Sequence, residues 1–519
     1  YTVARASLGL AKYVNSEDCA DKGVIISYDT RRMSFEFALT TARVLAAQGI
    51  KTYLFESTRP VPMCSFAVRE LGCKAGVMIT ASHNPKEYNG YKVYGEDGAQ
   101  MSPDATAKVV KYIDMSDYFG IPMADVATTE HKDISGKDNY MLADNITVIG
   151  ASIDELYFSQ VSKLTLSEEE VAKVGKNIKI VYSPLHGSGY MPITTMLARM
   201  NISVDVVDEQ RLPDPDFPTV AMPNPEQPEA LAMGVALADK TGSDLVIGTD
   251  PDCDRMGLAV RNREGKFVTL TGNQIGCLLM DYVLSRNAER GTMPENAAVV
   301  KTVVTTRLAD RIAGAYGAKV YDVLTGFKFI GEKIKQWEEN FHRTFMFGFE
   351  ESYGYLCGTH ARDKDAVVAA MLAAELACYC FANGKTLYDK LEEIWDKYGF
   401  FFETSKSLVF KGLDGMDKMA SIMEKLRSDA PKTLGGREVL SVSDYSTSIT
   451  VYSDGKQQLI NLPKANVLKY NLGDDMWACV RPSGTEPKLK IYVSTAGSDR
   501  NAVCELNTQI QSELAQFAQ

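Results

Sequence analysis

The chain has 519 residues and a formal net charge of -11. Because single hydrophobic cores stop growing at roughly 250–300 residues, we expect three or four domains. The acidic balance argues against a protein that holds nucleic acid or an anionic membrane by bulk electrostatics, since both need a basic face. Ten irregularly spaced cysteines without zinc-type pairs predict reduced thiols in a cytoplasmic protein.

From residue 24 onward, short β-branched runs alternate with amphipathic segments. We expect strands over residues 24–29, 51–56 and 75–80, and helices over residues 34–49 and 63–72. Ser34 is the expected N-cap of the first of these helices, and Gly49 is expected to end it. Strands that alternate with helices predict parallel βαβ units and a doubly wound sheet.

The same order of five elements is expected twice more, over residues 178–249 and 298–349. The first strand of the last copy is expected over residues 298–305. In each copy the third strand runs into the residues best suited to chemistry, at 80–85, 250–255 and 350–354. Ligands in open α/β sheets bind beyond the carboxyl ends of strands, so these three loops are expected to converge on one cleft.

Beyond about residue 403 the pattern changes to short alternating runs, with helices expected over 415–428 and 500–517. The predicted fold is three successive doubly wound α/β domains with mixed or parallel sheets around a central cleft, followed by a C-terminal α+β domain. We expect these domains over residues 1–172, 173–290, 291–403 and 404–519. The apolar stretch 366–382 is shorter than the roughly 20 residues of a membrane span and predicts a buried helix.

Ser82 follows an apolar strand directly and precedes His83, Asn84 and Pro85. Pro85 keeps its predecessor out of the helical region, which leaves the serine hydroxyl exposed at a strand end. A serine becomes a nucleophile only beside a base or an electrostatic activator, and His83 and Lys92 are the local candidates. From this segment alone, a turn or N-cap serine is an equal alternative.

Asp250, Asp252 and Asp254 follow a predicted strand at alternate positions, so a looped backbone could point three carboxylates at one centre. Oxygen ligands of this kind suit Mg²⁺. The calcium-binding EF-hand is excluded, because Arg255 and Arg261 stand where it needs glycine and glutamate. The alternative is a solvated acidic turn, in which Arg255 only neutralises the aspartates and does not bridge a metal and a phosphate.

Three further segments are weaker signals on their own. Glu350, Glu351 and Ser352 supply the acceptors and the hydroxyl needed to bind sugar hydroxyls, or they form a surface turn. The loop 481–485 combines a guanidinium, two hydroxyls and a glycine, which suits a dianionic phosphate, or it is a hairpin turn. Lys364 is either a proton-transfer group or a solvated charge at a helix start.

Four motifs stand in a fixed order along the chain: TASHNP at 80–85, DPDCDR at 250–255, EESYG at 350–354 and RPSGTEP at 481–487. In these motifs, and along nearly its whole length, the chain resembles the α-D-phosphohexomutases, the phosphoglucomutase and phosphomannomutase superfamily. Its length and the run 348–354 look most like the long bacterial phosphoglucomutase group, which is related to phosphopentomutases.

The resemblance implies a role for each matching residue. Ser82 corresponds to the phosphoserine, whose phosphate joins Asp250, Asp252 and Asp254 as a ligand of Mg²⁺. The implied catalytic residues beside the transferring phosphate are His83, Lys92, Arg255 and Lys364. The implied substrate-binding residues are Thr325, Gly326, Glu350, Ser352, Arg481, Ser483, Gly484 and Thr485. Many short phosphomannomutase-type sequences lack the lysine matched by Lys364, and its presence favours glucose.

The implied activity is the interconversion of hexose 1-phosphate and hexose 6-phosphate, with the glucose phosphates favoured, through Ser82 and a hexose 1,6-bisphosphate. Mg²⁺ is the implied metal, the bisphosphate is the implied activator, and either Lys92 or Lys364 is the implied base. Small sugar phosphates are the expected partners, without nucleic acid or membrane. The alternatives are a phosphomannomutase or phosphopentomutase of the same fold, a phosphotransferase with Asp250 as nucleophile, and a non-catalytic sugar-phosphate sensor.

The chain departs from the family pattern at two points. The family's glycine-rich segment ending in Leu-Arg-Gly, whose arginine lies near the phosphoserine, is not found, and we interpret this as an N-terminal piece missing before Tyr1. Cys253 stands between two aspartates of the metal loop, where other members often have glycine or alanine. We assign no chemical role to Cys253.

Overall fold

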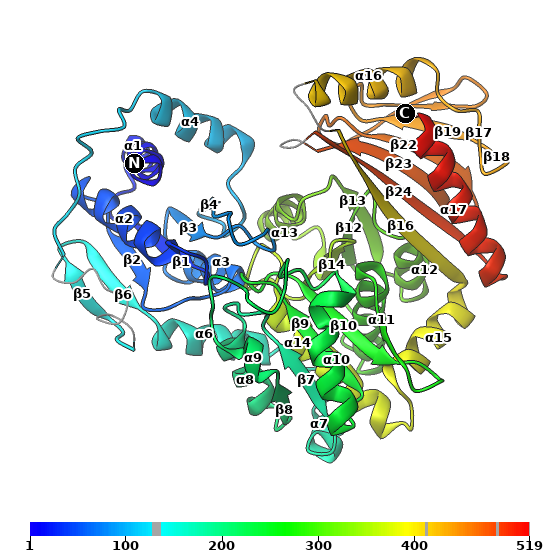
Figure 1. Ribbon diagram of the computed structural model, residues 1–519, viewed down its shortest axis with the longest axis horizontal. Helices are drawn as coiled ribbons and strands as arrows, with labels where there is room; N and C mark the ends of the chain where they lie inside the picture. Colours follow the sequence, from blue (N-terminus) through cyan, green and yellow to red (C-terminus); the bar gives the residue numbers. More distant parts are fainter. Residues whose placement is uncertain (127–135, 411–413, 484–486, 518–519) are drawn as a thin grey trace. The chain divides into compact units, whose positions relative to one another are not determined.

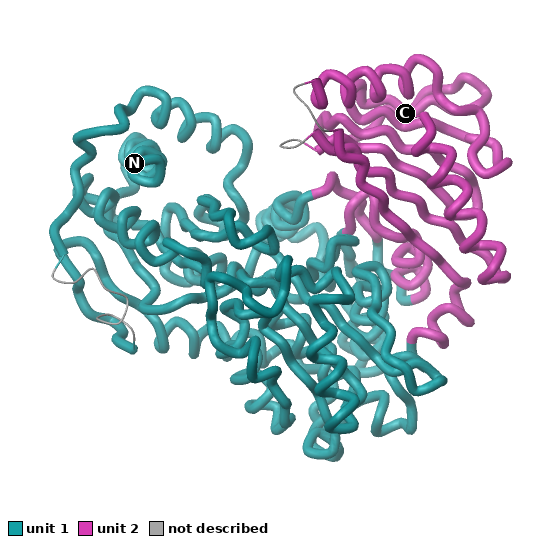
Figure 2. The backbone as a smooth tube through the Cα atoms, viewed as in Figure 1, with its two compact units in different colours: residues 1–300, 316–319, 326–390 teal, residues 301–315, 320–325, 391–519 magenta. Residues whose placement is uncertain are grey.

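The computed structural model describes residues 1–126, 136–410, 414–483 and 487–517. The chain divides into two compact units, shown in different colours in Figure 2. Unit 1 contains residues 1–300, 316–319 and 326–390, and unit 2 contains residues 301–315, 320–325 and 391–519. The domain boundaries expected from the sequence differ from this division and stay a prediction.

The first sheet of unit 1 has the order β4-β3-β1-β2-β6-β5 (Figure 1). Strands β1, β2, β3 and β6 are parallel, whereas β4 and β5 pair antiparallel at the two edges. The strands are β1 Val24–Tyr28, β2 Thr52–Phe55, β3 Ala75–Ile79, β4 Tyr91–Gly95, β5 Tyr140–Ala143 and β6 Ile146–Ile149. The helices are α1 Thr2–Ser16, α2 Ser34–Ala47, α3 Val61–Glu70, α4 Pro103–Asp114, α6 Ala151–Ser162 and α7 Glu168–Val174.

The second sheet of unit 1 has the order β11-β10-β9-β7-β8 and combines parallel with antiparallel pairs. Its strands are β7 Ile180–Ser183, β8 Val204–Val206, β9 Leu245–Thr249, β10 Met256–Arg261 and β11 Phe267–Thr269. The accompanying helices are α8 Tyr190–Arg199, α9 Asp208–Arg211, α10 Pro228–Thr241 and α11 Gly272–Glu289.

A third sheet has the order β13-β12-β14-β15. Its strands are β12 Ala297–Thr302, β13 Lys319–Val323, β14 Thr344–Glu350 and β15 Gly354–Leu356. The helices of this region are α12 Leu308–Ala315, α13 Lys328–Asn340, α14 Ala366–Ala382 and α15 Leu387–Tyr398. The three α/β regions therefore carry mixed sheets, as predicted.

The rest of unit 2 is built on a seven-stranded antiparallel sheet of order β16-β24-β23-β22-β19-β20-β21. These strands are β16 Phe400–Val409, β19 Ser441–Asp444, β20 Ile449–Tyr452, β21 Gln457–Leu459, β22 Leu468–Gly473, β23 Met476–Pro482 and β24 Lys488–Gly497. The remaining elements are α16 Gly415–Ser428, the two-stranded pair β17 Thr433–Leu434 and β18 Arg437–Glu438, and α17 Arg500–Phe517. Helices α16 and α17 share one hydrophobic core with the sheet, which confirms the predicted α+β domain.

Three details of the α/β regions differ from the sequence-based expectation. Ser34 does not cap α2, because Met33 precedes the helix in a left-handed conformation and the Ser34 hydroxyl donates to Asp29 instead. The strand predicted over 298–305 ends at Thr302, where a short turn separates it from α12. Antiparallel partners of the third strands, β4, β10 and β15, were not predicted at all.

Helix α14 spans the residues predicted for it, and its apolar side chains are almost all buried. Among the described residues, no single helix has the length and apolar composition to cross a membrane, and α14 with α15 meets that test only as a pair bent by 86°. Glu375 lies fully buried within α14. Its Oε1 accepts the backbone N–H groups of Leu166, at 2.7 Å, and Ser167, at 2.6 Å, just before α7 begins.

Glu375 should make stability depend on pH. Burial raises its pKa from 4.5 to about 7, against the lowering effect of the two backbone N–H groups. The native state therefore keeps a proton that the unfolded chain loses, so this stabilisation is complete below pH 4.5 and is lost as the pH rises through about 7. We expect Glu375→Gln to raise the melting temperature at pH 8 but not at pH 5. The gain in the free energy of unfolding at pH 8 should be at most about 3 kcal/mol.

Thermal unfolding of both proteins across this pH range measures the effect. Glu169→Gln, at the exposed second position of α7, is the matched control and should show no such difference. A pH-independent difference between Glu375→Gln and the wild type would contradict the assignment.

Candidate active site

Each third strand of the α/β regions leads into a loop that turns back into an antiparallel strand: β3 into β4, β9 into β10, and β14 into β15. Each loop holds one non-glycine residue in the left-handed region, namely Ser82 at φ 54°, Cys253 at φ 49° and Tyr353 at φ 65°. Such conformations cost about 1–3 kcal/mol each and cluster at functional sites. All three loops lie in unit 1.

Ser82 lies against the acidic triplet, 168 positions further along the chain. Its Oγ donates a hydrogen bond of 2.9 Å to Oδ2 of Asp250 and lies 3.2 Å from Nδ1 of His83. Its backbone N–H donates to Oγ1 of Thr80, which fixes the turn. The structure thus joins the predicted serine loop to the predicted metal loop, and a plain turn serine does not account for this long-range contact.

Asp250, Asp252 and Asp254 are buried and can bring one carboxylate oxygen each to within 4.8 Å of one another. Burial, followed by the neighbouring charges of Asp252 and Asp254, raises the pKa of Asp250 well above its usual range. Oδ1 of Asp252 and both carboxylate oxygens of Asp254 are buried without a hydrogen-bond partner. Buried, unsatisfied carboxylate oxygens around one point fit a hard divalent cation, and the solvated-turn alternative is wrong.

Two lysine side chains reach the triplet. Lys92 Nζ lies 2.9 Å from Asp252 Oδ2, and Lys364 Nζ lies 3.1 Å from Asp254 Oδ2. Lys364 also pairs with Asp363 at 2.9 Å, and its side chain is only 9% exposed. Lys364 is therefore not a solvated charge at the start of α14, although it stands two residues before that helix.

Arg255 has a partner that the sequence reading missed. Its Nη1 donates to Oε1 of Glu226 at 2.6 Å, whereas its Nε lies 3.9 Å from Asp254. Burial opposes the charge of Arg255, but Glu226 and then Asp254 outweigh it and raise the pKa further. The closest ionic partner of Arg255 is therefore Glu226, and not an aspartate of the triplet.

The family resemblance implies that Arg255 acts beside the transferring phosphate, and Glu226 should hold its guanidinium in the orientation for that role. We expect Glu226→Gln to lower kcat by about tenfold with little change in KM, because the loss of an ionic partner loosens the guanidinium. Steady-state kinetics measure both constants, and Glu229→Gln, at the exposed start of α10, is the control. An unchanged kcat for Glu226→Gln would show that Arg255 needs no ionic partner.

Glu350 ends β14 and is buried, so the surface-turn alternative is wrong for this residue. Burial raises its pKa to about 7, although the charges of Lys364 and Arg255 act in the opposite direction. Ser352 is partly exposed, and its Oγ donates to Oε1 of Glu351 at 3.2 Å. The sugar-binding assignment of Glu350 and Ser352 stays a prediction.

Comparison with known proteins decides the family. Models of the phosphoglucomutase/phosphomannomutase α/β/α domains I, II and III match residues 1–118, 155–265 and 271–398. The chain belongs to this family. Phosphoglucomutase from Staphylococcus epidermidis (strain ATCC 35984) is 39% identical over 499 residues, which are 95% of this chain and 86% of that protein. Phosphoglucomutase from Staphylococcus aureus (strain N315) is 37% identical over 99% of this chain and 89% of that protein.

Solved structures of the family share the fold of this phosphohexomutase. The open form of parafusin, a Paramecium phosphoglucomutase, aligns over 99% of this chain and 92% of that chain, with a TM-score of 0.72 and 17% identity. A phosphoglucomutase/phosphomannomutase family protein from Burkholderia thailandensis aligns over 100% of this chain and 94% of that chain, with a TM-score of 0.69 and 17% identity.

The predicted phosphate-binding residues of this phosphohexomutase lie in unit 2. Nη1 of Arg481 is hydrogen-bonded to Oγ1 of Thr325, so a predicted substrate residue orients the predicted phosphate-binding arginine. The Ser483 backbone N–H donates to the Lys488 carbonyl at 2.7 Å. Gly326 belongs to unit 1 and has φ 116°, which its lack of a side chain permits. Gly484 and Thr485 lie outside the described residues.

The residues that follow β1 were not predicted as part of the candidate site. Asp29 is buried, and it accepts hydrogen bonds from Thr80 Oγ1 at 2.7 Å and Ser34 Oγ at 2.8 Å. Burial raises its pKa to about 6, against the charge of Arg31. The rule that ligands bind beyond the carboxyl ends of strands could have found this segment, because β1 is the neighbour of β3 in the sheet.

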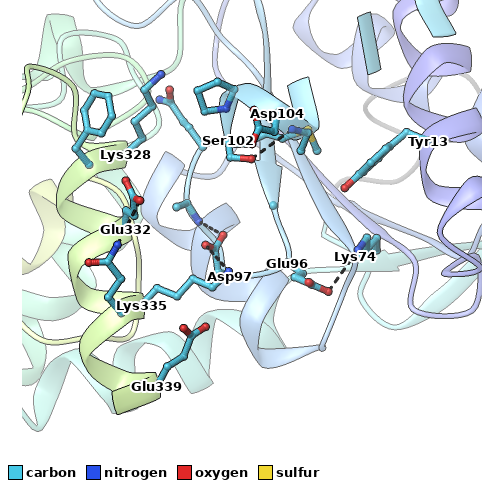
Figure 3. A pocket seen from close by; sticks show the side chains of 18 residues that line it. Tyr13, Lys74, Glu96, Asp97, Ser102, Asp104, Lys328, Glu332, Lys335 and Glu339 are labelled. Carbon is cyan, nitrogen blue, oxygen red and sulfur yellow. Dashed lines mark hydrogen bonds and ion pairs between the residues drawn. The ribbon is translucent and has the colours of Figure 1, made fainter. Parts of the chain in front are cut away.

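A separate cavity of about 490 Å³ lies in unit 1 between α13 and the segment that joins β4 to α4 (Figure 3). Two ion pairs lie among its lining residues, Lys74 with Glu96 at 3.6 Å and Lys335 with Asp97 at 3.7 Å. Ser82 and the acidic triplet do not line it. This cavity is therefore separate from the predicted serine and metal loops.

Proposed function

We propose that this phosphohexomutase interconverts glucose 1-phosphate and glucose 6-phosphate, with Ser82 as the carrier of the phosphoryl group. The observation that carries the proposal is the 2.9 Å contact between Ser82 Oγ and Asp250 Oδ2. It places a partly exposed hydroxyl at the edge of a buried carboxylate cluster in which Asp252 Oδ1 and both carboxylate oxygens of Asp254 have no hydrogen-bond partner. The two Staphylococcus relatives are named phosphoglucomutases, which supports glucose as the sugar.

Transfer begins with a phosphate on Ser82. Its P–O(Ser82) bond breaks as the phosphorus bonds to a hydroxyl oxygen of the hexose monophosphate, which gives a hexose 1,6-bisphosphate. The hydroxyl proton passes to a neighbouring base, for which Lys92 and Lys364 are the candidates. Burial opposes the charge of both lysines, but the neighbouring aspartates outweigh it and raise their pKa values, so either lysine can act as the base only in its neutral form. After the bisphosphate has turned over, the phosphorus of the other phosphate bonds to the Ser82 oxygen as its bond to the sugar oxygen breaks. The base returns its proton to that sugar oxygen, and the hexose phosphate leaves as its isomer.

The chain's own groups have distinct tasks in this proposal. His83 Nδ1, 3.2 Å from Ser82 Oγ, holds or returns the proton at the serine oxygen. Arg255 offsets charge on the transferring group. Glu350 and Ser352 bind sugar hydroxyls, while Arg481 and Ser483, with Gly484 and Thr485, hold the phosphate that is not reacting.

Asp250, Asp252 and Asp254 would hold Mg²⁺, which supplies neutralisation of the phosphoryl charge when bound. The donor set is oxygen only, buried and incompletely hydrogen-bonded, as a hard cation requires. The bisphosphate is the activator, since it restores the phosphate on Ser82. We place the enzyme in the cytoplasm because all ten cysteines are free thiols.

A turnover assay across glucose 1-phosphate, mannose 1-phosphate and ribose 1-phosphate, with bisphosphate primer and Mg²⁺, tests the proposal. We expect the highest kcat/KM with glucose 1-phosphate. A preference for the mannose or ribose substrate would reassign the enzyme as a phosphomannomutase or phosphopentomutase. Absence of turnover with all three substrates would favour the alternative of a non-catalytic sugar-phosphate sensor.

A further inference from the structure

Arg31 makes more contacts with the serine loop than any function assigned above explains. Its Nη2 donates to the carbonyl oxygens of Ser82 and Asn84, both at 2.5 Å. Its Nη1 donates to the carbonyl oxygens of Pro85, at 2.9 Å, and Tyr88, at 3.0 Å. One guanidinium group thus binds four carbonyl oxygens along the loop that joins β3 to β4.

Contacts with Asp29 and Phe217 fix the orientation of the Arg31 side chain. Its Nε lies 3.2 Å from Oδ2 of Asp29, and both side chains are fully buried. Asp29 is held in turn by the hydroxyls of Thr80 and Ser34. The ring of Phe217 covers the guanidinium, with its centroid 5.2 Å from Cζ. The arginine is therefore a rigid template for the loop.

The loop needs such a template because its backbone conformation is unfavourable. Ser82 has φ 54°, where a side chain is strained, and its carbonyl oxygen turns inward to Arg31. The hydrogen bonds from Arg31 to these carbonyl groups are partly buried, and a fully buried carbonyl left unpaired costs about 1–3 kcal/mol. A planar fork of five N–H donors can satisfy several of them at once, whereas a lysine ammonium offers three donors on one atom.

We infer that Arg31 is a positioning residue that holds the loop from Ser82 to Tyr88 in the conformation that directs the Ser82 hydroxyl to Asp250. This inference rests on the proposed function of Ser82 as the phosphoryl carrier. It assigns Arg31 no contact with substrate. Its neighbour Arg32 is the natural comparison, since that side chain is 65% exposed and forms an ion pair with Asp216 instead.

The kinetic test compares Arg31→Lys with Arg32→Lys. We expect Arg31→Lys to lower kcat by about 100-fold, because a displacement of about 1 Å at the reacting atom costs that much. KM should stay within about threefold, since the substrate-binding residues are elsewhere. Arg32→Lys should keep both constants within about twofold, as expected for an exposed ion pair.

Two further measurements separate positioning from general stability. Millimolar guanidinium ion should restore activity to Arg31→Ala by occupying the vacated site, and it should have no effect on Ser82→Ala. Hydrogen exchange should quicken in Arg31→Lys for peptides that cover residues 80–90 and stay unchanged in the C-terminal sheet. The inference fails if Arg31→Lys keeps its kcat, if KM rises as much as kcat falls, or if guanidinium gives no rescue.

The exchange measurement keeps this inference apart from the proposed function. One outcome is that the wild type lacks mutase activity while Arg31→Lys still shows faster exchange over residues 80–90. That outcome would support Arg31 as the positioning residue and reject the proposed function. The opposite outcome is normal turnover by the wild type together with unchanged exchange and kcat in Arg31→Lys. That outcome would reject the positioning role of Arg31 and leave the proposed function intact.

Discussion

Replacement of Ser82 by alanine is expected to lower kcat by roughly 10⁴-fold or more, the scale seen when a nucleophile is removed. The Ser82 hydroxyl lies at hydrogen-bond distance from both Asp250 and His83, so no neighbouring hydroxyl can take its place without moving the loop. Incubation of the wild type with radiolabelled glucose 1,6-bisphosphate should leave acid-stable phosphate on the peptide that contains Ser82. Steady-state kinetics and peptide mapping measure the two effects.

Ser159→Ala is the matched control, because Ser159 is an exposed serine on α6, away from the three loops. It should keep wild-type kcat and phosphate incorporation. Hydroxylamine-labile phosphate on Asp250, retained in Ser82→Ala, would contradict the assignment and identify an aspartyl-phosphate enzyme. The sensor alternative would gain support if Ser82→Ala lost turnover but kept its full biological effect.

The element order could be predicted because hydrophobic periodicity is local. Helices α14, α16 and α17 begin and end where their apolar patterns indicate. The antiparallel strands β4, β10 and β15 could not be recognised as a repeated feature, since their pairing depends on partners brought near by the loops. Residues 91–95 of β4 are mostly half-buried and lack the continuous apolar run of a central strand.

The chemical loops could be predicted from residue types that are rare together, such as three carboxylates at alternate positions. Arg31 and Glu226 could not be predicted in this way. An arginine or glutamate in a turn is usually a solvated charge, and only the tertiary fold brings Arg31 to the loop at Ser82 or Glu226 to Arg255. Their roles depend on contacts between segments that are distant in the sequence.

Backbone conformation and packing account for Cys253, to which the sequence assigned no chemical role. Its backbone is left-handed, at φ 49°, which explains why glycine suits this position in other members. The thiol is buried, and a Cβ added at Gly189 would lie 2.8 Å from its Sγ. The Cys253 side chain therefore packs against the start of α8, and no chemical role is needed to account for its position.

The second large effect concerns the acidic triplet. We expect Asp252→Asn to raise the Mg²⁺ concentration for half-maximal activity by at least about 100-fold, since even outer groups of metal sites change affinity by 10–100-fold. An amide has no negative charge, and its NH₂ group cannot act as a ligand. Asp252 is suited to the test because its Oδ2 bonds to Lys92 while its Oδ1 is buried without a partner.

Binding of Mn²⁺, followed by electron paramagnetic resonance, measures affinity without reference to turnover and should weaken in parallel. Asp205→Asn removes an equal charge from an exposed position on β8 and is the matched control. If both variants bound the ion as tightly as the wild type, the three carboxylates would not be the metal site. Their burial would then need another source of charge compensation, for which Lys92 and Lys364 are the nearest cations.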